Sequence, residues 1–295
     1  MFKKITAAVL AGALAVSVLA GCSGGEKVVV GSKNFTENEI LAEMMAQIVE
    51  KNTKIEVERK INMGGTLVCF EAIKKGQIDL YPEYTGTALM DELKLPVNNN
   101  SAEVYDTVSE KFESQFGIKW LKRLGFNNTF ALALPAAVAQ KNHIESISDL
   151  VPYAKGYVLG GAQEFFNRDD AYKGLIKAYG LTFKGTSKMD DSLKYQAISQ
   201  NKVQVIDAFS TDGQLKALNL KVLKDDKNFF PPYDAAPIVR EDTLKKYPQI
   251  EDLLNKLGGL MNDETVQELN YKADNQKESV EKVASDFLKE KGLIP

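Results

Sequence analysis

Short runs of β-branched residues alternate with helix-like patterns along the first part of the chain. Residues 28–30 are three valines, and residues 55–61 alternate apolar with charged side chains, so both runs predict strands. Between them, apolar residues recur at helical spacing through residues 40–48 and predict the buried face of a helix. Residues 36–39, Thr-Glu-Asn-Glu, predict a capping box at the start of that helix.

The same alternation continues along the chain until a C-terminal part that is almost wholly helical beyond residue 240. The pattern predicts further strands at residues 78–80, 157–159, 203–206 and 238–239, and helices at residues 66–75, 102–116, 171–179 and 192–200. Strands that alternate with helices favour an α/β fold with mostly parallel sheets.

Two short segments that place aromatics beside prolines, residues 129–135 and 230–234, predict crossings between two lobes. Two crossings give a first lobe built from both ends of the sequence and a second lobe built from its middle. We therefore expect the first lobe to comprise residues 28–130 and 233–295, and the second to comprise residues 131–232. A ligand cleft is expected between the lobes.

The N-terminal segment has the pattern of a secretory signal. Two lysines precede an apolar run that is shorter than the ~20 residues of a spanning helix. The run closes with Leu-Ala-Gly-Cys at residues 19–22, which resembles a bacterial lipoprotein signal. We expect residues 1–21 to be removed, Cys22 to carry lipid, residues 22–27 to form a tether, and the folded part to be extracytoplasmic and anchored to the cell membrane. Ordinary signal cleavage beside an incidental cysteine is the alternative.

The composition narrows the classes of function. The 295 residues carry 37 Lys and Arg against 40 Asp and Glu, a formal net charge of −3, which gives no broad basic surface for a nucleic acid. Two cysteines are too few for a disulfide framework, and one histidine leaves little scope for acid–base or zinc chemistry. The sequence has no G-x-S-x-G, Walker A or H-E-x-x-H motif. We expect a binding protein without cofactor or metal, not an enzyme.

Three features that could carry chemistry have simpler interpretations. His143 lies in a polar stretch and is expected to be a solvated surface residue. Cys69 lies in an apolar helical run and is expected to be buried and inert. Residues 64–66, Gly-Gly-Thr, could bind an anion at a helix start through backbone N–H groups, or could equally form a tight turn with a helix cap.

Aromatic residues gather where the predicted strands and crossings end. Tyr84 and Phe209 each follow a predicted strand, and Phe130 and Tyr233 lie in the two crossings. Rings that converge on one cleft would suit a quaternary ammonium group, which has no N–H to donate and binds through cation–π attraction and apolar contact. From the spacing alone, core packing is the commoner explanation of such residues.

Several longer motifs resemble one known family. They lie at residues 31–37 (Gly-Ser-Lys-Asn-Phe-Thr-Glu), 64–66, 78–89, 125–130, 164–168, 207–213 and 225–237. Together they resemble osmoprotectant-binding lipoproteins of ABC importers, from about residue 28 to the C-terminus. The resemblance implies a two-lobed, type II periplasmic-binding-protein-like fold that closes on glycine betaine, carnitine, choline or a related compound.

The resemblance also implies roles for individual positions. The aromatic cage would consist of Tyr84, Phe130, Phe209 and Tyr233. The ligand carboxylate would be bound by Lys33, Thr87 and Arg168, although an acidic neighbour could instead hold Arg168 in an ordinary salt bridge. A membrane permease and its ATPase, on separate chains, are the implied partners, and we expect a monomer.

This sequence departs from the family at two cage positions, where tyrosine is common. Phe130 and Phe209 keep the aromatic face but lose the hydroxyl, so the cage should persist with fewer hydrogen bonds. Thr87 is neutral, whereas an acidic residue there would repel a carboxylate and suit choline. We therefore expect glycine betaine, carnitine or proline betaine in preference to choline.

Two alternatives stay open. The same fold could bind an amino acid or another small solute, and a primary ammonium would then need a carboxylate such as Asp79, Glu83 or Asp207. The other alternative is a surface-anchored enzyme, although the sequence supplies no nucleophile–base pair and no metal-ligand set.

Overall fold

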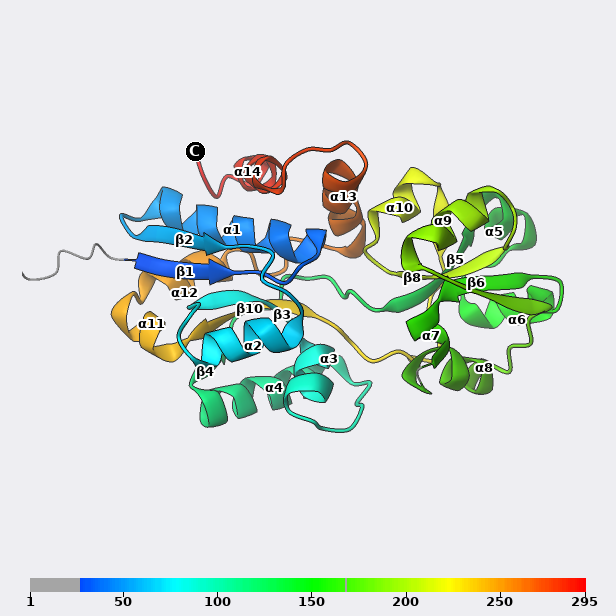
Figure 1. Ribbon diagram of the computed structural model, residues 1–295, viewed down its shortest axis with the longest axis horizontal. Helices are drawn as coiled ribbons and strands as arrows, with labels where there is room; N and C mark the ends of the chain where they lie inside the picture. The colour runs from blue at the N-terminus through cyan, green and yellow to red at the C-terminus, as the bar shows by residue number, and fades with distance from the viewer. Residues whose placement is uncertain (1–26, 168) are drawn as a thin grey trace, which may run out of the picture.

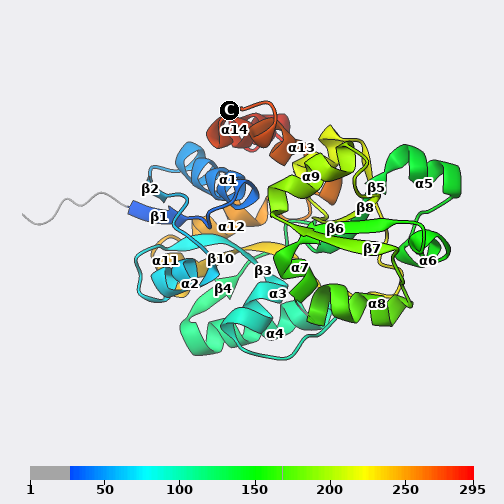
Figure 2. The ribbon, with the colours of Figure 1, turned by 45° about the vertical axis from the view of Figure 1, so that its right-hand side comes forward.

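The computed structural model describes residues 27–167 and 169–295. Two five-stranded sheets covered by helices form the framework of this part of the chain (Figures 1 and 2). The predicted α/β fold in two lobes is confirmed. The predicted signal peptide, Cys22 and Arg168 lie outside the described residues. Within the described ranges, no helix combines the length and the apolar character needed to cross a membrane.

The first sheet joins the two ends of the sequence, in the strand order β2-β1-β3-β10-β4. Its strands are β1 (Lys27–Gly31), β2 (Glu56–Lys60), β3 (Leu80–Tyr84), β4 (Ile118–Trp120) and β10 (Ala235–Arg240). β1 runs parallel to β2 and β3, whereas β10 runs antiparallel to β3 and β4. Lys27, expected in the tether, is the first residue of β1.

Helices cover both faces of the first sheet (Figure 1). One face carries α1 (Thr36–Asn52), α12 (Gln249–Asn255), α13 (Asp263–Asp274) and α14 (Val280–Glu290), and the other carries α2 (Thr66–Lys74) and α4 (Ser101–Phe116). The short elements α3 (Thr85–Thr87) and η1 (Ala88–Glu92) lead from β3 toward α4, and α11 (Glu241–Lys246) follows β10.

The helix α1 is buried more deeply than its apolar stripe predicts. Every residue from 40 to 49 is buried, because the helix lies between the first sheet and α14. The predicted capping box is wrong: the N-cap is Phe35, which makes no side-chain cap hydrogen bond. The Thr36 hydroxyl instead donates to Asp274 Oδ1 in α13 at 2.6 Å, so a long-range contact replaces the expected local one.

The second sheet comes from the middle of the sequence, in the order β7-β6-β8-β5-β9. Its strands are β5 (Phe130–Pro135), β6 (Val158–Ala162), β7 (Gly185–Met189), β8 (Val205–Phe209) and β9 (Leu220–Val222). Its helical segments are α5 (Ala136–Asn142), α6 (Ile147–Ala154), α7 (Gln163–Asn167), η2 (Asp169–Lys173), α8 (Gly174–Tyr179), α9 (Asp191–Ser199) and α10 (Gly213–Ala217). The pattern does not predict β4 and β9, which have three residues each, or β7, which is largely polar.

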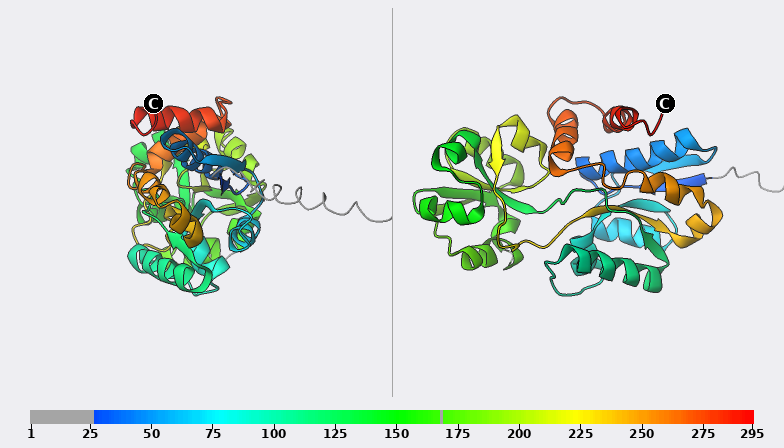
Figure 3. Two further views of the ribbon diagram at one scale, coloured as in Figure 1. Left: turned by 90° about the vertical axis from the view of Figure 1, so that its left-hand side faces the viewer. Right: turned by 180° about the vertical axis from the view of Figure 1, so that it is seen from behind.

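The chain passes between the two sheets through residues 121–129 and 223–234 (Figure 3). The predicted first crossing at residues 129–135 is wrong, because residues 130–135 form β5. This strand is buried at every residue except its final proline, so its continuous apolar run belongs to a central strand. Phe130, expected at the end of the first lobe, therefore opens the second sheet.

The expectation of mostly parallel sheets is only half right. β6 runs parallel to β7 and β8, but β5 runs antiparallel to β8 and β9, as β10 does to its neighbours in the first sheet. β5 and β10 are the strands that follow the crossings, and each begins opposite the last residue of an antiparallel neighbour, β8 and β3 respectively. In register, Ala235 lies opposite Tyr84, and Phe130 lies opposite Phe209.

The lobes also meet where α10 packs against α13, away from the two crossings (Figure 3). Asn270 Nδ2 in α13 donates to the Thr211 carbonyl at 2.9 Å, and Gln267 Nε2 donates to the Ser210 carbonyl at 2.7 Å. A Cβ atom on Gly213 would lie 2.6 Å from the Tyr271 backbone nitrogen. Glycine at this position therefore permits the close approach of the two helices.

We predict that Gly213→Ala lowers the free energy of unfolding by about 1–3 kcal/mol, because the new methyl group must push the α13 backbone away from α10. Urea unfolding followed by circular dichroism measures the change. Gly185→Ala is the matched control, since a Cβ there meets nothing within 4 Å. Equal stability of the two variants would contradict the tight α10–α13 contact.

Candidate functional site

A cavity of about 470 Å³ lies between the two lobes, within the size range of small-molecule sites. It is bounded by the last residues of β3 and β8 and by the chain that enters β5 and β10. Six of the seven side chains predicted to contact a ligand line it: Lys33, Tyr84, Thr87, Phe130, Phe209 and Tyr233. The seventh, Arg168, lies outside the described residues.

Two of the aromatic side chains come from the second sheet. Phe130 begins β5 and Phe209 ends β8, and the two residues are direct partners across the antiparallel pair. Their ring centroids are 4.8 Å apart, with the ring planes inclined by 30°. Because β5 and β8 run in opposite directions, the start of one strand and the end of the other meet at the cavity.

The other two predicted aromatics come from the first lobe and the second crossing. Tyr84 ends β3, and Tyr233 lies two residues before β10. A Cβ atom on Gly86 would come within 2.9 Å of the Tyr233 ring and 2.6 Å of the Pro232 carbonyl oxygen. The missing side chain at Gly86 therefore leaves the space that the Tyr233 ring occupies.

Phe35 is a fifth aromatic in the cavity lining, and it is not among the predicted ligand contacts. Its ring centroid is 6.0 Å from that of Tyr84, and 38% of the residue is exposed. Phe35 lies within the motif at residues 31–37, beside Lys33. An aromatic residue two positions after a predicted ligand contact, within the same motif, is the signal that could have identified it.

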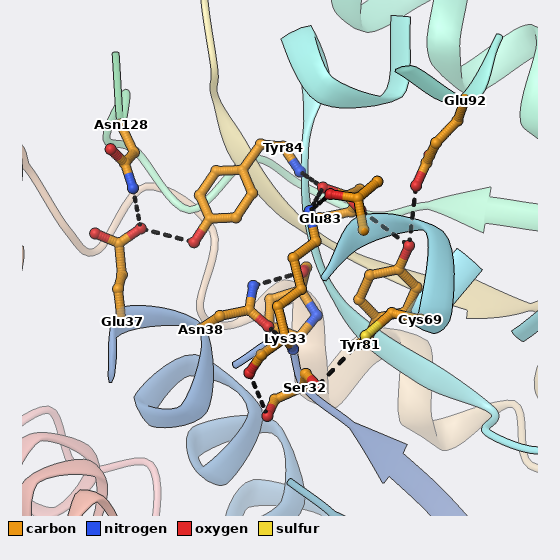
Figure 4. A network of polar contacts seen from close by, with 12 residues as sticks. Ser32, Lys33, Glu37, Asn38, Cys69, Tyr81, Glu83, Tyr84, Glu92 and Asn128 are labelled. Carbon is orange, nitrogen blue, oxygen red and sulfur yellow. Dashed lines mark hydrogen bonds and ion pairs between the residues drawn. The ribbon is translucent and has the colours of Figure 1, made fainter. Parts of the chain in front are cut away.

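Lys33 is buried and already paired. Its Nζ lies 2.5 Å from Glu83 Oε1 and donates to Thr66 Oγ1 at 3.0 Å (Figure 4). The same Glu83 oxygen accepts the backbone N–H of Tyr84 at 2.6 Å. The ion pair therefore holds Lys33 against the end of β3, and Glu83 offsets most of the positive charge that Lys33 brings to the cavity wall.

Behind this ion pair lies a second layer of buried polar groups (Figure 4). The Tyr81 hydroxyl lies 2.9 Å from Glu83 Oε2 and 3.3 Å from Glu92 Oε1. Burial, followed by the nearby Glu83 carboxylate, raises the pKa of the Glu92 carboxyl well above its ordinary value. Tyr81 and Glu92 do not line the cavity, and Tyr81 holds Glu83, the partner of Lys33, from behind.

Glu37 is a buried carboxylate in the cavity wall, near the start of α1. Its Oε1 accepts hydrogen bonds from the Tyr84 hydroxyl at 2.7 Å and from Asn128 Nδ2 at 2.9 Å. Burial raises the pKa of the Glu37 carboxyl, and the hydrogen bonds that it accepts partly oppose this rise. From the sequence, Glu37 is placed in the expected cap and in the motif at residues 31–37, but it is not predicted to contact a ligand.

Two threonines, Thr66 at the start of α2 and Thr87 at the end of α3, line the cavity. Gly65 is the N-cap of α2 and supplies no side-chain cap, while the Thr66 hydroxyl accepts the hydrogen bond from Lys33. Thr87 ends the short helix α3 directly after Tyr84 and lines the cavity. A hydroxyl at Thr87 can donate to a ligand carboxylate without adding charge.

The three carboxylates considered for an amino-acid ligand do not line the cavity. Asp79 accepts hydrogen bonds from the Val29 backbone and the Thr243 hydroxyl, and Asp207 pairs with Lys194 in the second lobe at 3.3 Å. The third, Glu83, is held by the ion pair described above. The acidic residues that do line it are Glu37, Asp91, Asp212 and Asp274.

The remaining candidates lie where the sequence predicts. His143 is exposed at the C-cap of α5. Cys69 is fully buried in α2, and burial raises the pKa of its thiol to about 11, so it is a poor nucleophile. No cluster of three or more His, Cys, Asp or Glu side chains suited to a metal ion occurs among residues 27–167 and 169–295.

Comparisons with known proteins agree with this geometry. Residues 26–290 match the OpuAC family, described as the substrate binding domain of the ABC-type glycine betaine transport system. A crystal structure described as a glycine betaine/carnitine/choline ABC transporter has a TM-score of 0.88 at 32% identity, covering 90% of this chain and 99% of that chain. The agreement in fold extends over nearly the whole of that structure.

Two curated relatives carry different ligand names. The Helicobacter pylori protein named ergothioneine transport permease/ergothioneine binding protein EgtU is 42% identical over 90% of this chain. This chain spans about half of that relative, 48% of its length. The Listeria monocytogenes carnitine transport binding protein OpuCC is 33% identical over 91% of this chain and 88% of its own length.

Proposed function

We propose that this chain, which belongs to the OpuAC family of substrate-binding domains of ABC-type glycine betaine transport systems, captures a trimethylammonium solute between its lobes and delivers it to a membrane permease. The family consists of substrate-binding proteins, not enzymes. The observation that carries the proposal is the convergence of Tyr84, Phe130, Phe209 and Tyr233, from four separate segments, on one cavity.

The aromatic lining fits the chemistry of such a solute. A quaternary ammonium carries its positive charge behind methyl groups and has no N–H, so aromatic faces can bind it through cation–π and apolar contact. Phe130 and Phe209 offer ring faces without hydroxyl groups, while Tyr84 directs its hydroxyl to Glu37. The absence of hydroxyl groups at Phe130 and Phe209 costs no contact with the head group, because a quaternary ammonium has no N–H to donate.

A carboxylate on the solute would be bound by Lys33, Thr87 and Arg168. Lys33 and Thr87 line the same cavity, and Thr66 helps to hold Lys33 in place. Because Glu83 offsets the charge of Lys33, we assign much of the attraction for the carboxylate to Arg168, which would reach it from the second lobe. Glycine betaine, carnitine and proline betaine are therefore preferred to choline, which has no carboxylate.

Ergothioneine is a second candidate within the same class, because it combines a trimethylammonium group and a carboxylate with a ring that donates N–H groups. The Helicobacter pylori relative at 42% identity is named for it. In this chain, Asp91, Asp212 and Asp274 line the cavity, and glycine betaine has no N–H for their oxygens to accept. These acidic side chains favour a ligand that reaches beyond the aromatic cage.

The division of the chain follows from the same proposal. We assign residues 233–295 and the chain up to the first crossing to one lobe, and the residues between the crossings to the other. Closure of the lobes would bring Arg168 toward the ligand carboxylate and so couple binding to movement. We expect the protein to act as a monomer with a permease and an ATPase on separate chains.

We further propose that lipid on Cys22 holds the protein at the outer side of the cell membrane, as the Leu-Ala-Gly-Cys motif at residues 19–22 indicates. Mass spectrometry of the membrane-associated protein should find an N-terminus that begins at a diacylglyceryl-modified Cys22. A mature N-terminus elsewhere, without lipid, would contradict the anchor and leave the binding proposal unaffected.

Isothermal titration calorimetry tests the ligand class. We expect heat of binding with glycine betaine, carnitine, proline betaine or ergothioneine, and weaker binding of choline. If none of these solutes binds while a solute without a quaternary ammonium does, the proposal is wrong.

The same titration tests the cage. Tyr84→Ala and Tyr233→Ala should each weaken binding by at least about 1 kcal/mol, because each removes one cation–π contact. Tyr153→Ala is the control, since Tyr153 is exposed on α6 and does not line the cavity. Unchanged affinity in both cage variants would exclude the cage while leaving the ligand class open to the wild-type titration.

A further inference from the structure

The carboxylate of Glu37 collects hydrogen bonds from both lobes. Tyr84 at the end of β3 and Asn128 in the first crossing donate to Oε1, as Figure 4 shows. Asn270 Nδ2 in α13 donates to Oε2 at 3.3 Å, and the Thr211 side chain in the second lobe is also a hydrogen-bond partner. Glu37 is therefore hydrogen-bonded to β3, the first crossing, α13 and the second lobe.

The donors around Glu37 are arranged for a charged acceptor. Asn128 and Asn270 both turn their NH₂ groups toward it, and in each the Oδ1 atom is buried without a hydrogen-bond partner. Burial, followed by the nearby Glu37 carboxylate, also raises the pKa of the Tyr84 hydroxyl, which therefore stays protonated and donates. Such a set of donors suits a carboxylate, which only accepts.

Within the described part of the chain, the Glu37 carboxylate has hydrogen-bond donors around it but no ion-pair partner. Among the described residues, no lysine or arginine forms an ion pair with it, and the nearby Lys33 is paired with Glu83. Lys33 Nζ also lies 5.2 Å from the Tyr84 ring centroid, where its charge would oppose a second cation. A carboxylate that is buried in the cavity wall and lacks a counter-ion would gain most from a positively charged ligand.

We propose that Glu37 determines the charge selectivity of the site: its carboxylate, with the Tyr84 ring that it holds, favours a cationic head group over an uncharged group of the same shape. The hydrogen bond from the Tyr84 hydroxyl to a carboxylate increases the electron density of the ring and so strengthens its attraction for a cation. This inference rests on the proposed function, because it concerns the head group of that ligand.

The competing explanation is that Glu37 only holds Tyr84, Asn128 and the second lobe in place. That role would affect any ligand that fills the cage, whether charged or not. Glycine betaine and 3,3-dimethylbutanoate separate the two roles, since they have the same shape and carboxylate and differ in whether nitrogen or carbon carries the three methyl groups.

Calorimetric titration of both compounds into wild-type protein and the Glu37→Gln variant is the test. We expect the Kd of glycine betaine to rise about tenfold in the variant, because one charge near the cation is lost. The Kd of 3,3-dimethylbutanoate should stay the same or fall. The ratio of the 3,3-dimethylbutanoate Kd to the glycine betaine Kd should therefore fall about tenfold or more. Glu39→Gln is the matched control, since Glu39 lies on the same helix and does not line the cavity.

Glu37→Asp provides a second variant if Glu37→Gln does not fold, as judged by its thermal unfolding curve. It keeps the charge and shortens the side chain, so the ratio of the two Kd values should stay close to that of wild type. Two outcomes overturn this inference without affecting the proposed function. One is an equal rise of both Kd values in Glu37→Gln, and the other is a change in the ratio of the two Kd values that is as large in Glu37→Asp as in Glu37→Gln. Failure of the wild-type protein to bind glycine betaine, carnitine or ergothioneine overturns the proposed function, and this inference with it.

Discussion

The cavity depends on the antiparallel entry of one strand into each sheet. β10 runs against β3, and β5 runs against β8, so that in each lobe the end of one strand meets the start of another. The pairs Ala235–Tyr84 and Phe130–Phe209 are the first contacts of these two ladders. A slip of one residue in either register would turn the aromatic side chain to the opposite face of its sheet. Backbone pairing thus fixes where Tyr84, Phe130 and Phe209 meet the cavity.

Each lobe also places a buried ion pair close to an aromatic side chain of the cavity. In the first lobe, Lys33 pairs with Glu83, the residue before Tyr84; in the second, Lys194 pairs with Asp207, two residues before Phe209. Buried pairs of this kind add little net stability, because desolvation offsets their attraction, but loss of one partner leaves an uncompensated charge at a cost of about 3–5 kcal/mol. They therefore fix geometry at the strand ends more than they stabilise the fold.

Glu37 stands apart from these two pairs, because amide and hydroxyl donors surround it instead of a cation. The wall of the cavity thus contains Lys33, whose charge Glu83 balances from behind, and Glu37, which has no ion-pair partner among residues 27–167 and 169–295. A ligand with a cationic head would complete this arrangement, and a purely anionic ligand would not. The burial that raises the pKa of Glu37 is the same burial that a bound cation would offset.

The sequence predicts the two-lobed α/β fold and six of the side chains that line the cavity, but not Phe35, Glu37 or the contacts that hold the lining in place. Four ligand contacts could be predicted because they follow strands or lie near crossings within motifs of a known family: Tyr84, Phe130, Phe209 and Tyr233. The role of Glu37 could not be predicted, since its hydrogen-bond partners lie 47, 91 and 233 residues away along the chain. β5 resembles a crossing because its last residue is a proline, and only its pairing with β8 identifies it as a strand. The roles of Cys22 and Arg168 stay predictions.

A crystal structure of the protein with glycine betaine tests the central claim most directly. We predict that the quaternary nitrogen lies within about 6 Å of the ring centroids of Tyr84, Phe130, Phe209 and Tyr233, with the carboxylate toward Lys33 and Thr87. An ordered ligand that binds outside the four rings, or one whose carboxylate instead of its ammonium enters them, would contradict the account.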